Sequence, residues 1–413
     1  MSKDKSLVHY GDLLAAVIAT AGPGCSILDW SLNLGTETVQ GFASLMLRAK
    51  VKVKTAHGEV TEVNLMVKRP PALEVHAAMI NSMGNIIERE GAYFNIAVPK
   101  LQEKCPQLPI VRSLVAHENA IIMEDLCERG FQTLCKTMQD MGRGNKLTFP
   151  IARMCVRKLA KIHAASLGVN WDEVIPPLDI AGAEIFKMLI GRGIQTIIPM
   201  MKKLFPEHRS LEKYAEFMAK PKLLDDFIEY MAYDDSRPPN VLLHGDCHIN
   251  NMMFKLDKNG NAVDMRFIDF QIFRFGPACN DLIYLMYTSV NQAFRDKHEK
   301  DVIRAYVEAF NAAACITPDL LDFDQFWRIY ERTRYFGVVM AMGIRPLQFM
   351  TDFQPATDQG ELTEEAFATM NQFDDAMVQP AMLALENDPE FREEFRTLIA
   401  HAMDVLREFV FQK

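Results

Sequence analysis

The first part of the chain is dominated by short stretches with strand character. Residues Leu47–Lys54 alternate between apolar and basic side chains, which is the period of a strand with one buried face. Val63–Lys68 and Ala120–Leu126 are apolar runs of strand length. Tyr10–Thr20 has instead an amphipathic helical pattern, which a Gly-Pro-Gly sequence stops. The pattern predicts a strand-rich region that extends to about Asp125.

From Leu126 onward, the apolar residues follow the helical period. One predicted helix also carries His163, and its apolar face is formed by Ile151, Met154, Cys155, Leu159 and Ile162. Further helical segments are predicted at Ile185–Phe205, Val302–Ala314, Phe323–Met342 and Phe391–Phe411. We expect His163 to be a hydrogen-bonded residue of the core or of a helix end rather than a catalyst.

A hairpin interrupts the helical region. Met252–Leu256 and Ala262–Ile268 are apolar-rich and strand-like, and the segment between them contains Asn-Gly, a strong hairpin-turn signal. We expect this hairpin to be the one clear β element of the larger region. The predicted fold class is therefore α+β with two lobes, a β-rich N-terminal lobe at residues 1–125 and a mainly helical C-terminal lobe at residues 126–413.

Composition narrows the class of protein. A chain of 413 residues with 49% hydrophobic and 24% charged residues has globular values and can bury a full core. The net charge of -9 argues against nucleic acid as a main partner and against attraction to an anionic membrane. The charge and composition leave the oligomeric state open.

Two further features bear on the compartment. The 8 cysteines are scattered without a C-x-x-C pair, which favours free thiols and a cytoplasmic location. No run reaches the ~20 apolar residues of a membrane-spanning helix. Leu13–Ala21 ends in Ala-Thr-Ala, like a signal-peptide cleavage site, but Asp4 and Asp12 lie where a signal peptide carries basic residues. An opening amphipathic helix is the preferred interpretation.

The richest motif is the segment from His244 to Asn251, followed by a second acid after the hairpin. It has the form H-x-D-x-x-x-x-N, and Asp269 follows the apolar strand. This spacing is typical of phosphoryl transfer from Mg-ATP in kinases. Asp246 would accept the proton of a substrate hydroxyl. Asn251 and Asp269 would bind Mg²⁺, which prefers oxygen ligands.

The same segment has three other interpretations. A calcium loop starting at Asp257 would need its Gly at the sixth position, but Gly260 is the fourth residue. A zinc site at His244, Cys247 and His248 lacks a second ligand pair at the usual spacing. The acids and amides are also common turn residues. The other kinase-like features along the chain argue against that last interpretation.

A kinase also needs a strand lysine that binds phosphates and a helix glutamate that holds the lysine. Lys68 ends one predicted strand, and the helical stretch Ile86–Phe94 carries Glu90. Glu88 is the rival, but it lies off the same helix face. We predict that Lys68 and Glu90 form this pair; the alternative is that both are ordinary surface charges.

Two more segments complete the predicted nucleotide site. Ala120–Leu126 would be the hinge whose backbone groups at Glu124, Asp125 and Leu126 bind the adenine edge. The loop before Lys68 would cover the phosphates, with Gly41 allowing close approach of the backbone and Ser44 donating a hydrogen bond. This loop lacks a G-x-G-x-x-G pattern, and a hairpin turn fits it nearly as well.

Taken together, these motifs resemble the ecdysteroid kinase-like family, also called CHK kinase-like, of the choline kinase and aminoglycoside phosphotransferase group. The resemblance covers most of the chain and rests on Gln40–Ser44, Val67–Pro70, Glu90 with Tyr93-Phe94, Met123–Leu126 with Gly130-Phe131, Leu159–Ser166, His244–Asn251, Ile268–Gln271, Gly276-Pro277 and Asn280–Leu282. It implies a bilobal protein-kinase-like fold and ATP-dependent phosphorylation of a small-molecule alcohol. Ecdysteroids are one known substrate class of this branch.

Departures from protein kinases sharpen the expectation. Gln271 stands where a mobile D-F-G switch has glycine, and no A-P-E segment follows. Both features argue against a protein substrate. We expect Asp281 to tie down the loop that carries Asp269, and His244 to brace the catalytic loop. The sequence leaves three kinds of acceptor open: a steroid alcohol, a choline-like amino alcohol or a xenobiotic. The alternative functions are a choline- or aminoglycoside-type kinase and a catalytically silent binding protein.

Overall fold

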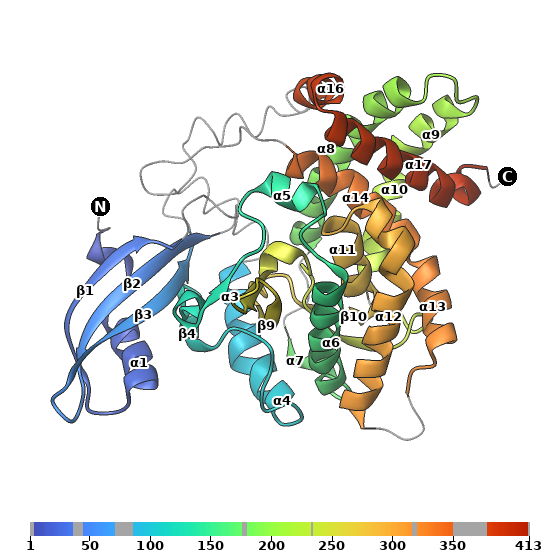
Figure 1. Ribbon diagram of the computed structural model, residues 1–413. Coiled ribbons are helices and arrows are strands. Elements are labelled where there is room, and N and C mark those ends of the chain that lie inside the picture. Colours follow the sequence, from blue (N-terminus) through green and yellow to red (C-terminus); the bar gives the residue numbers. More distant parts are fainter. Residues whose placement is uncertain are drawn as a thin grey trace.

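The N-terminal part is built around one antiparallel sheet. The structure is a computed structural model that describes residues 4–35, 44–70, 86–175, 180–232, 234–315, 320–349 and 378–411. The strand order in the five-stranded sheet is β1-β2-β3-β5-β4 (Figure 1). The strands are β1 (Ser26–Leu34), β2 (Leu45–Lys54), β3 (Val60–Arg69), β4 (Ser113–His117) and β5 (Ala120–Glu124), and helix α1 (Tyr10–Ala21) precedes them.

The two faces of this sheet have different partners. Alternate residues of β2, from Leu45 to Val53, are buried against Leu13, Ala16 and Val17 of α1. Lys50, Lys52 and Lys54 point away from α1 and are exposed. The predicted half-exposed strand is thus confirmed. The apolar segment with a signal-like end forms α1, whose buried face is part of this core.

A helical segment separates β3 from β4. It consists of α3 (Ile86–Ala92), a π-helical turn at Tyr93–Ala97 and α4 (Val98–Gln102). Ile87, Tyr93 and Leu101 belong to the same hydrophobic core as the C-terminal helices, so this segment connects the sheet to the rest of the molecule.

The C-terminal part is mainly helical, and the helices pack around α11 and α14 (Figure 1). The helices and short helical turns of this part are η3 (Leu126–Arg129), α5 (Met138–Gly142), α6 (Phe149–Ala165), α7 (Trp171–Val174), α8 (Ile180–Leu204), α9 (Leu211–Met218), α10 (Pro221–Met231), η4 (Ile249–Asn251), α11 (Cys279–Thr288), α12 (Gln292–Ala314), α13 (Phe323–Arg332), α14 (Arg334–Gln348), α16 (Val378–Asn387) and α17 (Pro389–Phe411). Helices α6 and α12 lie side by side, and α14 contacts α8, α11 and α17.

One predicted helix is divided in the structure. The segment predicted at Phe323–Met342 forms α13 and α14, which meet at Thr333. The Thr333 hydroxyl donates a hydrogen bond of 2.9 Å to the carbonyl of Ile329, four residues earlier. Such a bond competes with the helical ladder and bends helices.

The C-terminal part contains more strands than the sequence indicates. The predicted hairpin is confirmed as β8 (Met252–Leu256) and β9 (Ala262–Phe267), which β6 (Phe131–Gln132) joins. A second pair, β7 (Asn240–Leu243) with β10 (Arg274–Pro277), contradicts the expectation of one β element. These extra strands have four residues or fewer, which is too short for a periodic signal.

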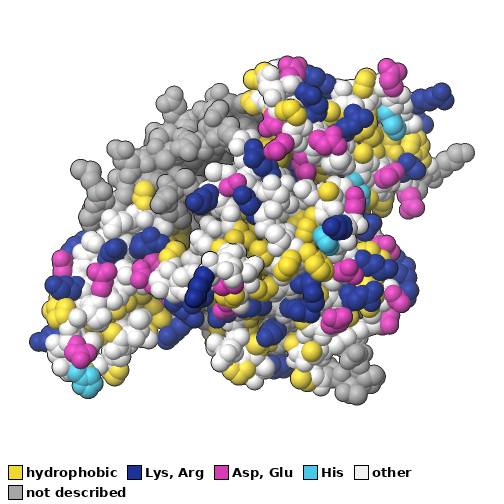
Figure 2. All heavy atoms as spheres, in the orientation of Figure 1, with side chains coloured by type: hydrophobic (Ala, Val, Ile, Leu, Met, Phe, Trp, Pro, Cys, Tyr) yellow, Lys and Arg dark blue, Asp and Glu magenta, His cyan; other side chains and the backbone are white. Residues whose placement is uncertain are grey.

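The predicted α+β class is confirmed, with a β-rich N-terminal part and a helical C-terminal part. The lobe boundary between residues 125 and 126 stays a prediction. None of the described helices combines the length and the apolar character that a membrane crossing requires. On the visible face, positive and negative side chains are interspersed (Figure 2).

Candidate active site

The loop that carries Asp246 follows β7 and needs a glycine at its start. Gly245 has a φ of 88°, which favours glycine. A Cβ atom there would lie 2.0 Å from the carbonyl oxygen of Ile272. Arg274 also donates a hydrogen bond of 3.2 Å to the Gly245 carbonyl. The loop is therefore pressed against the segment after Asp269.

Two donors hold the Asp246 carboxylate. The Tyr284 hydroxyl on α11 lies 2.6 Å from Oδ1, and the Asn251 side-chain amide lies 3.0 Å from Oδ2. Burial alone raises the pKa of Asp246, but nearby His248 and the Tyr284 hydroxyl outweigh it and hold that pKa below its usual range. The lowered pKa favours the ionised form of Asp246.

His248 faces the same carboxylate oxygen at a longer distance. Its Nδ1 accepts a hydrogen bond of 3.2 Å from the backbone N–H of Asn250, so Nε2 carries the proton in the neutral ring. Nε2 lies 3.5 Å from Oδ1 of Asp246. Burial lowers the pKa of His248, but the charge of Asp246 raises it above its ordinary value.

Asp269 is brought beside Asn251 by the hairpin. The backbone N–H of Ile268 donates a hydrogen bond of 3.0 Å to the carbonyl of Asn251. Asp269 itself has a φ of 66°, a conformation in which aspartate is enriched among non-glycine residues. Its side chain is 29% exposed, which leaves carboxylate surface open to a ligand.

Lys68 joins Glu90 and Asp269. Its ammonium lies 2.5 Å from Oε2 of Glu90 and 2.8 Å from Oδ1 of Asp269. Burial lowers the pKa of Lys68, but the two carboxylates outweigh it and raise that pKa above its ordinary value. Lys68 is therefore a buried cation. The structure pairs it with Glu90, as predicted; Glu88 lies on the exposed side of α3.

Asp281 holds the catalytic loop rather than the loop predicted from the sequence. Its two carboxylate oxygens accept hydrogen bonds from the backbone N–H groups of His244 (2.7 Å) and Gly245 (3.0 Å). His163 Nε2 lies 3.2 Å from the same carboxylate. The expectation that Asp281 ties down the Asp269 loop is wrong, because both of its carboxylate oxygens bind the backbone of the Asp246 loop. His163 is a buried, hydrogen-bonded residue, as predicted.

The Asp269 segment is held instead by His244 and Glu90. His244 Nε2 lies 3.0 Å from the carbonyl of Ile268. Its Nδ1 accepts a hydrogen bond of 3.3 Å from the N–H of Asp246, so it also braces the catalytic loop, as expected. The N–H of Phe270 donates a hydrogen bond of 3.1 Å to Oε1 of Glu90. The Phe270 ring stacks on Tyr93 at 4.0 Å between ring centroids. Phe270 is thus packed in the core.

At the predicted hinge, the acidic side chains are engaged within the protein. Asp125 accepts hydrogen bonds from Arg48 on β2 (2.6 Å) and from the N–H of Cys127 (3.0 Å). Glu124 accepts hydrogen bonds from the backbone N–H of Arg112 (3.0 Å) and from the side chain of Arg129 (2.7 Å). The carboxylates of the hinge are therefore held by internal contacts, and the binding of adenine by its backbone groups stays a prediction.

The predicted phosphate-covering loop is only partly within the described residues. Gly41 lies outside them, and Ser44 precedes β2. The sheet face opposite α1 carries Lys68 together with three methionines, because Met46 pairs with Lys68, and Met66 pairs with Met123.

The oxygen donors at the site fit magnesium better than the alternatives. The amide of Asn251 turns its nitrogen to Asp246, so its carbonyl oxygen points elsewhere, and Asp269 adds a carboxylate; both are hard oxygen ligands. No group of three or more His, Cys, Asp or Glu side chains suited to a metal occurs among the described residues. Asp257, the start of the proposed calcium loop, accepts hydrogen bonds from the N–H groups of Asn259 and Asn261, so it stabilises the hairpin turn.

Two residues of the site were missed from the sequence. Tyr284 lies on α11 three residues after Asp281, and nothing in its local pattern marks it as a neighbour of Asp246. Arg48 is one of several basic residues of β2, and only the strand order brings it to Asp125.

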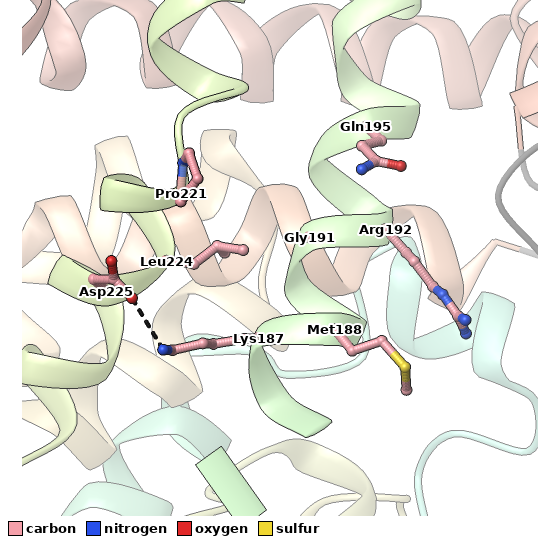
Figure 3. A pocket seen from close by; sticks show the side chains of 8 residues that line it. All are labelled: Lys187, Met188, Gly191, Arg192, Gln195, Pro221, Leu224 and Asp225. Atoms are coloured by element: carbon pink, nitrogen blue, oxygen red, sulfur yellow. Dashed lines mark hydrogen bonds and ion pairs between the residues drawn. The ribbon is translucent and has the colours of Figure 1, made fainter. Parts of the chain in front are cut away.

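A hollow on the surface lies apart from these residues, between α8 and α10 (Figure 3). Its volume is about 490 Å³, and none of the predicted site residues lines it. Lys187 and Asp225 form an ion pair of 2.9 Å across it. Because none of the predicted site residues lines this hollow, we assign it no role in the reaction at Asp246.

Solved structures of several kinases are similar to this chain. Similar solved structures include a choline kinase from Streptococcus pneumoniae, with 12% identity and a TM-score of 0.39 over 90% of this chain and 100% of that one. A choline kinase from Cryptosporidium parvum has 9% identity and a TM-score of 0.45, with coverage of 97% and 100%. A microcompartment-associated aminopropanol kinase has 13% identity and a TM-score of 0.35, with coverage of 90% and 98%.

Among curated proteins, none matches the chain significantly. The sequence model of the ecdysteroid kinase-like family matches residues 38–315, which is well over half of the chain and contains Lys68, Glu90, Asp246, Asn251 and Asp269. The chain therefore belongs to the ecdysteroid kinase-like family and is, by class, a small-molecule kinase.

Proposed function

We propose that this kinase transfers the γ-phosphoryl group of ATP to a hydroxyl group of a small molecule, with Asp246 as the general base. The observation that carries the proposal is the pairing of Lys68 with both Glu90 and Asp269. This contact joins β3, α3 and the segment after β9, so the predicted phosphate-binding and metal-binding groups meet at one place.

The chain's own residues supply the nucleotide site. Lys68 would bind the phosphates, and Glu90 keeps the lysine in place from the buried side. Gly41 and Ser44 belong to the segment that would cover the phosphates. The backbone groups of Glu124, Asp125 and Leu126 would bind the adenine edge; Leu126 is the first residue of its helical turn, where the N–H group has no intrahelical acceptor.

Asn251 and Asp269 would hold Mg²⁺. When bound, this ion neutralises charge on the phosphate oxygens of ATP. The role of the protein is to present one amide and one carboxylate oxygen from two hydrogen-bonded segments.

Asp246 performs the proton transfer. The acceptor hydroxyl oxygen forms a bond to the γ-phosphorus, and the bond between that phosphorus and the β–γ bridging oxygen breaks. The bonding electron pair leaves with ADP, and the hydroxyl proton moves to the Asp246 carboxylate. The two hydrogen bonds from Tyr284 and Asn251 hold that carboxylate in place during the transfer.

The acceptor belongs to the class of small alcohols, and ecdysteroids are the first candidates because of the family. The reaction would take place in the cytoplasm. All eight cysteines lie within the described residues and are free thiols, which suits a reducing compartment.

The test is phosphoryl transfer by the purified full chain. ATP labelled at the γ-phosphate is offered with Mg²⁺ and a panel of ecdysteroids, amino alcohols, other small alcohols and peptides. We expect label on a small alcohol, and a loss of ~10²-fold or more in Asp246→Asn, since general-base catalysis has this size. Equal rates for this variant and the wild type would remove Asp246 as the base.

Two other results would replace the proposal. Label that appears only on peptides would indicate a protein kinase. If saturating Mg-ATP gives no thermal stabilisation and no acceptor is labelled, the chain is catalytically silent, because any ligand that binds the folded state raises its stability.

A further inference from the structure

Tyr284 makes the shortest contact to the Asp246 carboxylate. Its hydroxyl lies 2.6 Å from Oδ1, which is within the range of charge-assisted O–H···O⁻ hydrogen bonds. The ionised carboxylate can only accept, so the phenol donates. Burial and the charge of Asp246 raise the pKa of Tyr284 well above its usual value, so the phenol keeps its proton.

Tyr284 itself is rigidly held. Its side chain is buried, with a residue exposure of 4%. It lies on α11, the helix whose first turn binds the backbone of His244 and Gly245 through Asp281. One helix therefore fixes the catalytic loop twice, at its backbone and at the side chain of Asp246.

The two oxygens of Asp246 have different partners. Asn251 comes from the same loop and binds Oδ2, and it is also a predicted metal ligand. Tyr284 comes from outside the loop and binds Oδ1. The terminal torsion of an aspartate is broad, so two donors on different oxygens are needed to set the plane of the carboxylate. His248 lies 3.5 Å from Oδ1 and is too distant to replace the phenol.

We propose that Tyr284 is a positioning residue of the phosphoryl transfer, whose hydroxyl fixes the plane of the Asp246 carboxylate toward the acceptor hydroxyl. The inference rests on the proposed function, in which Asp246 is the general base. Tyr284 acts through Asp246, because its hydroxyl donates its hydrogen bond to that carboxylate. Its loss therefore slows the chemical step without weakening ATP binding.

The test compares two phenylalanine variants of the same helix. Tyr284→Phe keeps the ring and removes the hydroxyl. The control is Tyr287→Phe, one helical turn later, which removes a buried hydroxyl that lies 3.0 Å from Nε2 of His401. Both variants lose one buried hydrogen bond of α11, so a purely structural effect of the lost bond is matched.

The measurement is the rate of phosphoryl transfer in a single turnover, with enzyme in excess. One series uses ecdysone as acceptor, and a parallel series uses water. We expect Tyr284→Phe to lower this rate about 10-fold or more, since small misplacements of a reacting group have large effects. In steady-state assays, the KM of Tyr284→Phe for ATP stays within about twofold of the wild-type value. Tyr287→Phe keeps the wild-type rate. Equal rates in the two variants, or a loss confined to the KM for ATP, would overturn the inference.

A crystal structure of each protein separates this inference from the proposed function. We expect one orientation of the Asp246 carboxylate in the wild type and in Tyr287→Phe, and a rotated or mixed orientation in Tyr284→Phe. If the wild type transfers no phosphate at all, the proposed function fails. The carboxylate orientation alone then decides whether Tyr284 orients Asp246. An unchanged orientation in Tyr284→Phe then refutes it.

Discussion

The two halves of the site are held together by different forces. Around Lys68, opposite charges from three distant segments meet, and the Lys68 and Glu90 side chains are 4% and 0% exposed. Around Asp246, one carboxylate is held by neutral donors from its own loop and from α11. Breaking the first cluster leaves a buried charge without its partner, which reduces stability. Breaking the second mainly misplaces a reacting group, which reduces rate.

The largest effect on stability is expected for Glu90→Gln. The substitution removes one of the two negative charges beside buried Lys68, and Asp269 keeps the other. The cost should therefore reach at most about 3 kcal/mol, the lower end of the range for a buried charge left without any partner. Chemical denaturation would measure the free energy of unfolding, with Glu88→Gln on the exposed face of the same helix as the control. If both variants unfold at the same denaturant concentration, the charge of Glu90 does not stabilise the fold through Lys68.

A large effect on rate is expected for Asn251→Ala. The variant loses one donor to Asp246 and one predicted Mg²⁺ ligand, so kcat should fall ~10²-fold, the size seen for single electrostatic contacts in active sites. The Mg²⁺ concentration for half-maximal activity should rise as well. Steady-state assays over a Mg²⁺ series measure both, and an unchanged Mg²⁺ dependence would remove Asn251 from the metal site.

An effect on both stability and rate is expected for Asp281→Asn. Asp281 lies outside the Lys68 cluster, but it holds the backbone of the loop that carries Asp246. An amide has only one acceptor oxygen, so a buried N–H of His244 or Gly245 loses its partner. An unsatisfied buried donor costs about 1–3 kcal/mol. Both the free energy of unfolding and kcat should fall. Loss of stability with an unchanged kcat would show that the loop keeps its shape without this contact.

The smallest effect is expected for Arg48→Gln. The Arg48 side chain is 29% exposed, whereas the side chain of its partner Asp125 is 1% exposed. Asp125 keeps its hydrogen bond from the N–H of Cys127 in the variant, so we expect a loss of only about 1 kcal/mol. Because its partner Asp125 lies in the hinge, the KM for ATP should change more than kcat. Lys50→Gln, at the next position on the same strand face, is the control. A large fall in kcat would place Arg48 among the residues of the chemical step.

Sequence periodicity and spacing predicted the elements that are long or strongly marked. The alternation of β2, the Asn-Gly turn of the β8–β9 hairpin and the choice of Glu90 over Glu88 all have local signals. The β7–β10 pair lacks such a signal because the two strands are short and far apart in the chain. The break at Thr333 depends on one side-chain hydrogen bond, which an apolar pattern does not register.

The sequence by itself determined the fold class and the family and predicted candidate residues for the chemistry, because residue type and spacing record backbone period and ligand chemistry directly. Only the tertiary structure decided which groups support them. Asp281 binds the Asp246 loop rather than the Asp269 loop, and Tyr284 reaches Asp246 from 38 residues away along the chain. Hydrogen bonds act over about 3 Å, so their partners are set by the packing of α11 against the loop and not by separation along the chain.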